Sequence, residues 1–187
     1  MSVEIEIKLP LLNGAEVLEF LQTKGNFKYE KRQLDYYYNS PHRDFLKNPD
    51  NICEWLRLRV VGDKCEINYK DWLPHEEKIK SHCTEYETEI DSYEEFKQIL
   101  HILNFKPMIK VDKVRKAWRV DDVEVSIDNV ADLGYFIELE YKGNGVNDVE
   151  SARTKLFDVL KSLNAKTGEV DLKGYPYLML RKGGYLP

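Results

Sequence analysis

The sequence predicts an α+β fold in a single domain over residues 1–187, with an antiparallel sheet able to close on itself. The length suits one domain, and a hydrophobic fraction of 42% permits a real core. Two similar halves follow one another, each with a strand, a helix and then further strands. Strands that alternate in polarity and follow one another directly are typical of α+β proteins with an antiparallel sheet.

Eight segments are expected to be strands because polar and apolar residues alternate in them, or because aromatic and β-branched residues are concentrated there. Gly62-Asp63 separates two of the segments and resembles a hairpin turn. The expected strands are residues 1–10, 27–40, 53–61, 64–72, 83–91, 106–120, 123–129 and 135–141.

Three segments are expected to be helices, at residues 11–25, 92–103 and 149–163. Leucine and valine recur at helical spacing in the first and third, and the second opens with a capping box, Ser92-Tyr93-Glu94-Glu95. The tail, residues 166–187, is rich in glycine and holds a short apolar piece without an assigned element.

Composition excludes several classes of function. A net charge of −5 argues against a surface for nucleic acid or for anionic membranes. No apolar run approaches the length of a membrane span, and the start of the chain lacks the pattern of a signal peptide. Three cysteines and four histidines show no metal-ligand spacing. A reduced, cytoplasmic protein is therefore expected.

The first strand places Glu4, Glu6 and Lys8 on one face and Val3, Ile5 and Ile7 on the other, because side chains alternate along a strand. A solvated outer face explains this stretch alone. The later strands repeat the arrangement with Arg, Lys and Glu, often as same-sign pairs two residues apart. Such pairs repel and need compensation. The polar faces carry Arg57, Arg59, Lys64, Glu66, Asn68, Lys70, Glu85, Glu87, Glu89, Lys113, Arg115, Glu124, Ser126, Asp128, Glu138 and Glu140.

If the sheet closes with this face inward, acidic and basic walls oppose each other in a charged tunnel. Carboxylates are the ligands that hard divalent cations prefer, and Arg and Lys recognise phosphate oxygens. A polyphosphate with bound Mg²⁺ or Mn²⁺ needs both sets together. The sequence has no Gly-rich phosphate loop and no Walker motif, so phosphate binding must come from side chains.

An ordered set of motifs over residues 1–180 resembles the CYTH superfamily, the triphosphate tunnel metalloenzymes. Its hallmark is Glu-x-Glu-x-Lys, present here at residues 4–8. The set continues with Asp35-Tyr36-Tyr37-Tyr38, Leu56-Arg57-Leu58-Arg59, Tyr69-Lys70, Glu85-Tyr86-Glu87, Lys113-Val114-Arg115, Asp128, Leu133-Gly134 and Glu138-Leu139-Glu140.

The resemblance implies an eight-stranded antiparallel closed β tunnel with a charged interior and helices packed outside. It also implies catalytic Mg²⁺ or Mn²⁺ bound by Glu4, Glu6, Glu87, Glu138 and Glu140, with Glu85 as the reserve for Glu87. The residues expected to hold the triphosphate are Lys8, Arg57, Arg59, Lys70, Lys113 and Arg115. The expected catalytic residues are Lys8, Lys70, Arg115 and Asp128. Asp128 is expected either to orient a basic partner or to serve near the metal. Any one of these side chains alone is also explained by an ion pair that only balances charge.

The family divides into class IV adenylyl cyclases and triphosphatases, and the shared motif does not separate them. Residues 35–59 resemble the cyclase-type subgroup, with Pro41-x-Arg43-Asp44-Phe45 between two of the motifs. The chain departs from the family at Asp71, where Gly is common, and at Gly174, where Ser is common. The leading hypothesis is a cyclase that converts ATP to cyclic AMP and pyrophosphate.

Two alternatives stay open. One is a triphosphatase acting on thiamine triphosphate, inorganic triphosphate or nucleoside triphosphates, and the other is a non-catalytic binder of polyphosphate or nucleotide. The expected partner is a small-molecule triphosphate, with neither nucleic acid nor membrane. Because some members of the family pair, a homodimer is also an expectation.

Overall fold

The computed structural model describes residues 2–76, 82–143, 149–169 and 173–186. The chain forms two compact units, each described here by itself. Unit 1 comprises residues 1–3, 32–112 and 173–187, and unit 2 comprises residues 4–31 and 113–172. The single domain over residues 1–187 stays a prediction.

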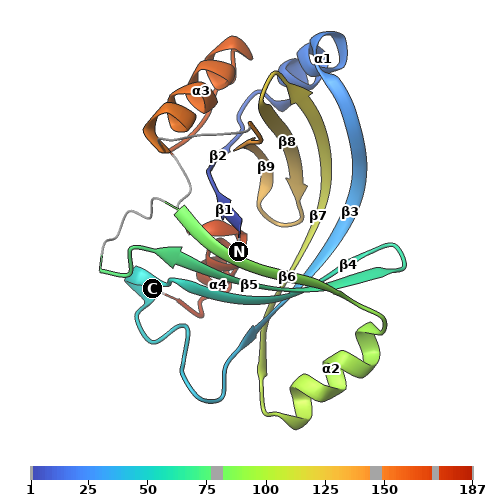
Figure 1. Cartoon of the computed structure of the whole chain (residues 1–187), viewed down its shortest axis with the longest axis vertical. Helices are drawn as coiled ribbons and strands as arrows, with labels where there is room; N and C mark the ends of the chain where they lie inside the picture. The colour runs from blue at the N-terminus through green and yellow to red at the C-terminus, as the bar shows by residue number, and fades with distance from the viewer. Residues whose placement is uncertain (1, 77–81, 144–148, 170–172, 187) are drawn as a thin grey trace. The chain divides into compact units, whose positions relative to one another are not determined.

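The strands form one sheet in the order β1-β6-β5-β4-β3-β7-β8-β9-β2, and Figure 1 labels them along the chain. The pairs with a described register are all antiparallel, as predicted. The described strands are β1 (Ser2–Glu4), β2 (Glu6–Pro10), β3 (Asn26–Asn39), β4 (Glu54–Val61), β5 (Lys64–Leu73), β6 (His82–Ile90), β7 (Lys106–Val120), β8 (Val123–Val130) and β9 (Gly134–Tyr141).

The first predicted strand is divided at Ile5, so the described residues form nine strands where eight were expected. Its first part, β1, is the neighbour of β6, and its second part, β2, is the neighbour of β9. One extended segment therefore serves two partners, which the alternation of its residues does not reveal. Closure into a tunnel and a charged interior stay predictions.

The three predicted helices are confirmed as α1 (Gly14–Lys24), α2 (Tyr93–Ile102) and α3 (Val149–Ser162). Ser92 accepts a hydrogen bond from the backbone N–H of Glu95 and so caps α2, as its capping box predicts. A short 3₁₀ helix, η1 (Pro49–Asn51), lies in the loop before β4. None of the described helices is both long enough and apolar enough to cross a membrane.

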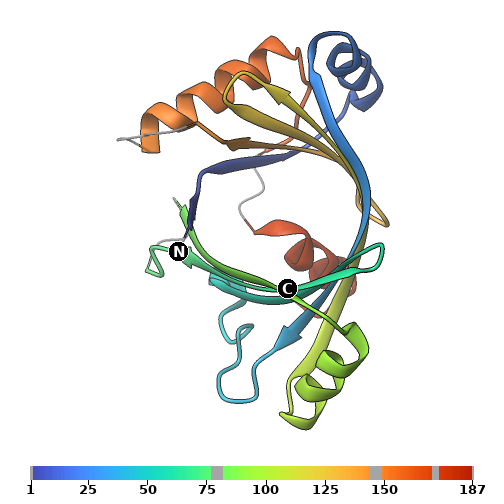
Figure 2. The same cartoon turned by 45° about the vertical axis from the view of Figure 1, so that its right-hand side comes forward.

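A fourth helix, α4 (Gly174–Lys182), occupies the apolar piece of the tail that received no element from the sequence. Gly174 has φ +77°, a conformation that glycine adopts without strain, which explains why glycine is accommodated at this departure from the family pattern. Tyr175, Tyr177 and Leu180 are buried. Figure 2 shows α4 on the side of strands β4 to β6 that faces away from α2.

In unit 2, helices α1 and α3 cover the apolar faces of β2, β8 and β9. Val17 and Leu21 of α1 and Leu156 of α3 join Val125 and Leu139 in one buried cluster. Helix α3 contacts β9, β2 and β8 (Figure 1). The apolar positions of these strands are thus buried under helices, and the alternating charged positions face the other way.

Unit 1 repeats this arrangement with α2. Leu100 of α2 packs against Tyr38 of β3 and against Leu56 and Leu58 of β4. Phe45, from the loop after β3, belongs to the same cluster. For β2, β8 and β9 the alternation therefore predicted the buried apolar side correctly, as it did for Leu56 and Leu58 of β4. Trp55 of β4 is also buried although it alternates with these leucines, and Tyr86 of β6 is exposed.

Replacing Leu156 of α3 by alanine tests this packing. Leu156 is fully buried, so Leu156→Ala is expected to lower the free energy of unfolding by about 2–5 kcal/mol. Leu12→Ala is the control, because Leu12 is exposed and its truncation should cost no more than about 0.5 kcal/mol. Urea denaturation measures both, and equal costs would contradict the packing described.

Candidate functional site

The register of unit 2 arranges the charged positions of β2, β9 and β8 in rows across the strands. Glu6 lies opposite Glu140, and Glu140 lies opposite Glu124. In the next row, Lys8 lies opposite Glu138. Directly opposed side chains have Cβ atoms about 5 Å apart, so three carboxylates stand side by side and repel one another unless compensated.

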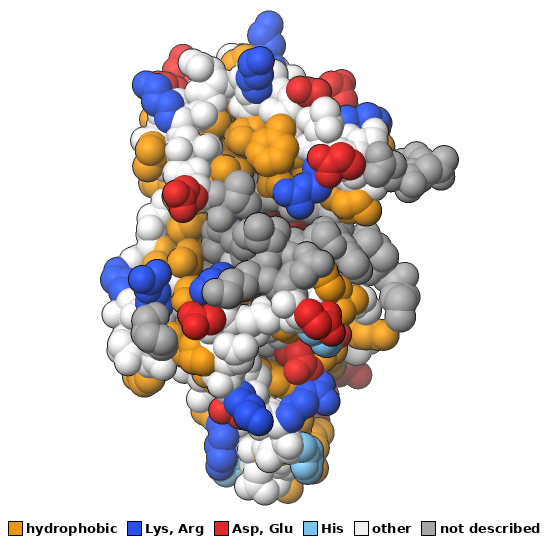
Figure 3. Space-filling view, turned by 90° about the vertical axis from the view of Figure 1, so that its left-hand side faces the viewer, with side chains coloured by type: hydrophobic (Ala, Val, Ile, Leu, Met, Phe, Trp, Pro, Cys, Tyr) orange, Lys and Arg blue, Asp and Glu red, His pale blue; other side chains and the backbone are white. Residues whose placement is uncertain are grey.

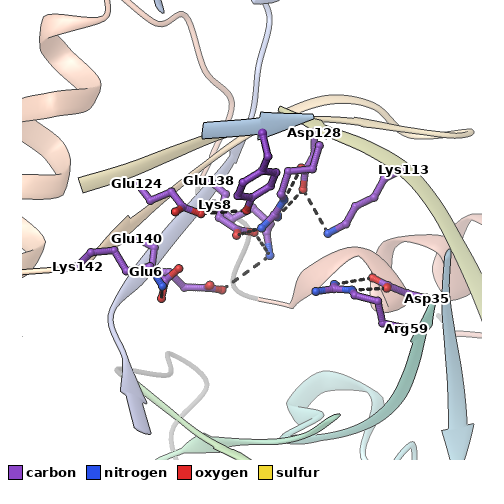
Figure 4. A network of polar contacts seen from close by, with 12 residues as sticks. Glu6, Lys8, Asp35, Arg59, Lys113, Glu124, Asp128, Glu138, Glu140 and Lys142 are labelled. Atoms are coloured by element: carbon purple, nitrogen blue, oxygen red, sulfur yellow. Dashed lines mark hydrogen bonds and ion pairs between the residues drawn. The ribbon is translucent and has the colours of Figure 1, made fainter. Parts of the chain in front are cut away.

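Glu138 and Asp128 are the centre of a buried ionic network in unit 2 (Figure 4). Arg115 donates to both carboxylate oxygens of Asp128 in a fork, with Nε–Oδ1 and Nη2–Oδ2 distances of 2.7 and 2.6 Å. The Nη1 atom of Arg115 lies 2.7 Å from Oε1 of Glu138, whose other oxygen lies 3.0 Å from Nζ of Lys8. Lys113 completes the network at 3.4 Å from Asp128.

These contacts set the protonation of the two acids. Burial alone would raise the pKa of Asp128, but Arg115 and Lys113 outweigh it and hold the pKa below its ordinary value of 3.8. Burial likewise opposes ionisation of Glu138, yet Arg115, Lys8 and Lys113 hold its pKa well below the ordinary value. Both acids are therefore carboxylates at neutral pH.

The row of glutamates has weaker partners. Oε1 of Glu6 lies 3.8 Å from Nζ of Lys8, and Oε1 of Glu140 lies 2.5 Å from Nζ of Lys142. The side chain of Lys142 is half exposed. Glu124 accepts a hydrogen bond of 3.1 Å from the hydroxyl of Tyr29 in β3. Burial and the charge of Glu124 raise the pKa of Tyr29 to about 12, so the hydroxyl remains a donor.

Unit 1 carries a second set of charges on β3, β4, β5 and β6. Asp35 lies opposite Arg59 in the register, and the two form a forked pair with distances of 2.7 and 2.8 Å (Figure 4). Glu66 of β5 lies 3.6 Å from Arg59. Burial and the neighbouring Glu87 raise the pKa of Glu66, although Arg59 and Arg57 oppose this shift.

Asn68 of β5 organises the carboxylates of β6. Its side-chain amide is almost fully buried and donates to both Glu85 and Glu87, the latter at 3.1 Å. Lys70 lies 3.4 Å from Glu85. Glu85 is largely buried, whereas Glu87 is half exposed and so is the more open of the two to an added ligand.

Arg57 is buried but poorly paired. Its terminal Nη2 atom lies 3.7 Å from Glu66 and 3.6 Å from Glu87, beyond ordinary hydrogen-bond length. Its Nε atom is buried and has no hydrogen-bond partner among the described residues. A guanidinium in this state needs an acceptor that those residues do not supply.

Within unit 2 the structure brings together Lys8, Lys113, Arg115, Asp128 and Glu138, and within unit 1 it groups Arg57, Arg59, Lys70, Glu85 and Glu87. Glu4 belongs to β1, and its side chain lies outside the described part. The assigned roles stay predictions.

Glu89 pairs with Lys64 at an exposed position. Sequence reasoning assigned no site role to Asn68, Tyr29, Glu66 or Glu124. For Asn68, Glu66 and Glu124 the polar face of their strands was the signal, whereas the sequence pattern gave none for Tyr29.

The described residues contain no group of three or more acid, histidine or cysteine side chains close enough to form a ready metal site. The donor chemistry nevertheless fits Mg²⁺ or Mn²⁺, because Glu6 and Glu140 are partly buried carboxylates opposed in register. Lysines neutralise these carboxylates in this structure. A bound cation would relieve the same repulsion.

The segment Pro41-x-Arg43-Asp44-Phe45 has a structural explanation. The guanidinium of Arg43 pairs with Glu54 at 2.5 Å, and Asp44 accepts from Asn39 at 2.6 Å. Phe45 packs into the core of unit 1. These contacts fix the loop between β3 and β4, so the segment does not by itself identify a reaction.

The molecular surface in Figure 3 shows acidic and basic side chains interspersed with apolar ones. The absence of a nucleic-acid partner stays a prediction.

Asp128→Asn tests the buried network through the pH dependence of stability. The folded state lowers the pKa of Asp128, so the ionised carboxylate contributes fully to the free energy of unfolding above pH 3.8. This contribution is lost as the pH falls through the lower pKa of the folded state. We expect Asp128→Asn to cost about 3 kcal/mol at pH 7 and clearly less at pH 3, measured by urea denaturation.

Asp112→Asn is the matched control, because Asp112 forms a similar fork with the exposed Arg32. An exposed pair is expected to contribute less than about 1 kcal/mol. The network would be refuted by a cost for Asp128→Asn that is the same at both pH values, or no larger than that of the control.

Comparisons with known proteins identify the family of this chain. Residues 2–175 match the CYTH domain model. A curated protein of Methanocaldococcus jannaschii named putative adenylate cyclase is 33% identical over 175 residues, which cover 92% of this chain and 96% of that protein. A protein of Pyrococcus horikoshii OT3 with a solved structure is 29% identical, with a TM-score of 0.80 and coverage of 96% and 99% of the two chains.

A putative adenylyl cyclase from Hippeastrum, described as having a dominant triphosphatase activity, shares the fold with a TM-score of 0.64 at 17% identity. That alignment covers 98% of this chain and 96% of the other. From the family match and the curated relative together, this chain belongs to the CYTH domain family.

Proposed function

We propose that this protein is a divalent-metal-dependent enzyme that acts on a triphosphate, of the class IV adenylyl cyclase type. The reaction would convert ATP to cyclic AMP and pyrophosphate. Family membership and the name of the curated relative support this proposal. Each unit by itself also carries basic and carboxylate side chains of the kinds that such a substrate requires.

The observation that carries the proposal is the state of Arg57. Its guanidinium is only 7% exposed, its Nε donor is unpaired, and its nearest carboxylates lie 3.6 Å or farther away. An isolated structural ion pair would be expected to close to hydrogen-bond distance. A phosphate oxygen supplies the missing acceptor, and it suits the fixed fork of arginine.

The other basic residues proposed to hold the triphosphate are Lys8, Arg59, Lys70, Lys113 and Arg115. Each now contacts a carboxylate, so the chain itself compensates these charges. Positive groups aimed at a phosphate chain stabilise the charge that develops when a phosphoryl bond breaks. Lys8 and Arg115 share Glu138, which keeps both cations in fixed positions.

Glu6, Glu138 and Glu140, with Glu4 and Glu87, are the residues proposed to hold the cation. When bound, Mg²⁺ or Mn²⁺ would neutralise phosphate oxygens and fix the phosphate chain. Asp128, held by Arg115 and Lys113, is the positioning residue of this arrangement, because its forked contact fixes the guanidinium that touches Glu138.

Triphosphate hydrolysis is the second candidate function. The same charged groups would serve it, and the fold neighbour from Hippeastrum is described as mainly a triphosphatase. Purified protein with Mn²⁺ and ATP, thiamine triphosphate or inorganic triphosphate separates the two by its products. Cyclic AMP with pyrophosphate supports the cyclase. Orthophosphate without cyclic AMP would replace it with the triphosphatase.

Arg57→Lys tests the proposed role of the buried Arg57 guanidinium in phosphate binding, because lysine keeps the charge but lacks the Nε donor and the planar fork. We expect kcat/KM on the best substrate to fall by about 10²–10³-fold, as for the loss of one donor to a developing phosphate charge. Arg32→Lys, at an exposed position of β3, should stay within about twofold of the unsubstituted protein.

Steady-state kinetics at matched Mn²⁺ concentration makes the comparison, with circular dichroism to verify folding. An Arg57→Lys protein that is folded and fully active would show that the poorly paired guanidinium has no part in the reaction.

A further inference from the structure

Gln33 of β3 carries a buried acceptor that the structure leaves without a donor. The residue is 6% exposed, and its Oε1 atom has no hydrogen-bond partner among the described residues. Buried amide oxygens are normally satisfied, because leaving one unpaired costs folding free energy. Nε of Arg57 is likewise unpaired, so the described residues of unit 1 include a buried acceptor and a buried donor without partners.

Both atoms come from the charged face of the unit 1 strands. Gln33 lies two residues before Asp35, so the two side chains share a face of β3, and Asp35 pairs with Arg59 on that face. Arg57 lies opposite Tyr37 in the register, four residues beyond Gln33. At about 3.3 Å per residue, the two positions are about 13 Å apart along the strand.

The two unpaired atoms need different hydrogen-bond partners. The Nε donor of Arg57 suits an anionic oxygen, whereas Oε1 of Gln33 needs an N–H or O–H group. An ionised triphosphate presents only acceptor oxygens, so it cannot donate to Oε1 of Gln33. A ligand that satisfies this oxygen as well as Arg57 therefore carries a donor-bearing organic part beyond its phosphate chain.

We propose that Gln33 recognises the organic part of the substrate by accepting a hydrogen bond from it, so that the enzyme selects an organic triphosphate over inorganic triphosphate. The inference rests on the proposed function and narrows its substrate class. Gln33 is a specificity residue in this assignment and takes no part in bond breaking. A nucleoside and a thiamine group both offer suitable donors, so the experiment includes both.

The test measures dissociation constants by calorimetry with Mn²⁺ for three probes: a methylene-bridged ATP analogue, thiamine triphosphate and methylene-bridged inorganic triphosphate. Gln33→Met keeps the size of the side chain and removes its acceptor. We expect it to weaken binding of at least one organic probe about tenfold, the loss of one buried hydrogen bond, with inorganic triphosphate changed less than twofold. The affected probe identifies the organic part.

Three further measurements separate recognition from structure. Gln33→Glu keeps an acceptor and should recover part of the lost preference, expressed as the ratio of organic to inorganic dissociation constants. Gln98→Met, on the exposed side of α2, should leave this ratio unchanged. The Tm of Gln33→Met should rise by about 2–4 °C, because an unpaired buried group is removed.

Equal weakening of all three probes by Gln33→Met, or no weakening of any, would overturn the inference while leaving the proposed function standing. If the unsubstituted protein binds none of the probes, the proposed function is wrong and the inference falls with it.

Discussion

The buried pairing of Asp128 and Glu138 with Arg115 is the constraint on which the rest of the site depends. Asp128 is fully buried and Glu138 nearly so. A buried carboxylate is tolerated only with a close cation and hydrogen bonds, and Arg115 provides both to two acids at once. Lys8 and Lys113 complete the balance. Removing one member leaves another charge buried without compensation.

This constraint follows from the strands themselves. Helices α1 and α3 cover the apolar side of β2, β8 and β9, so the charged positions between them lie together on the opposite side. Helix α2 does the same in unit 1, where Asp35, Arg59 and Glu66 form the corresponding cluster. Each unit thus has an apolar core on one side of its strands and an ionic layer on the other.

An ionic layer of this kind contains side chains of both signs of charge. In the proposed function, a cation and a triphosphate would take over contacts that lysines and glutamates now make with each other. The exchange replaces existing ion pairs, so it does not require bare charges to be buried first. Nε of Arg57 and Oε1 of Gln33 have no hydrogen-bond partner within the described part of the chain, so a ligand would displace no such bond there.

Much of the strand arrangement and of its charged faces was predictable from the sequence. The alternation of Glu6 and Lys8 with Ile5 and Ile7, for example, determines which side of that strand is buried. The family motifs also marked Arg57, Arg115 and Glu138. The pairings were not predictable, since alternation assigns a face and leaves open which strands are neighbours. Three features depend on contacts between distant residues. They are the pairing of the N-terminal segment with two different strands, the helix α4 that begins at Gly174, and the hydrogen bonds that the Asn68 amide donates to β6.

In the proposed function, this protein binds a triphosphate together with a divalent cation. Calorimetric titration measures this binding when a methylene-bridged ATP analogue is added to the protein with Mn²⁺ and again after a chelator has removed the metal. We expect saturable binding with Mn²⁺ that weakens at least tenfold without it. Equal affinity in both conditions would contradict the metal-dependent site, and absence of binding in both would contradict a triphosphate site altogether.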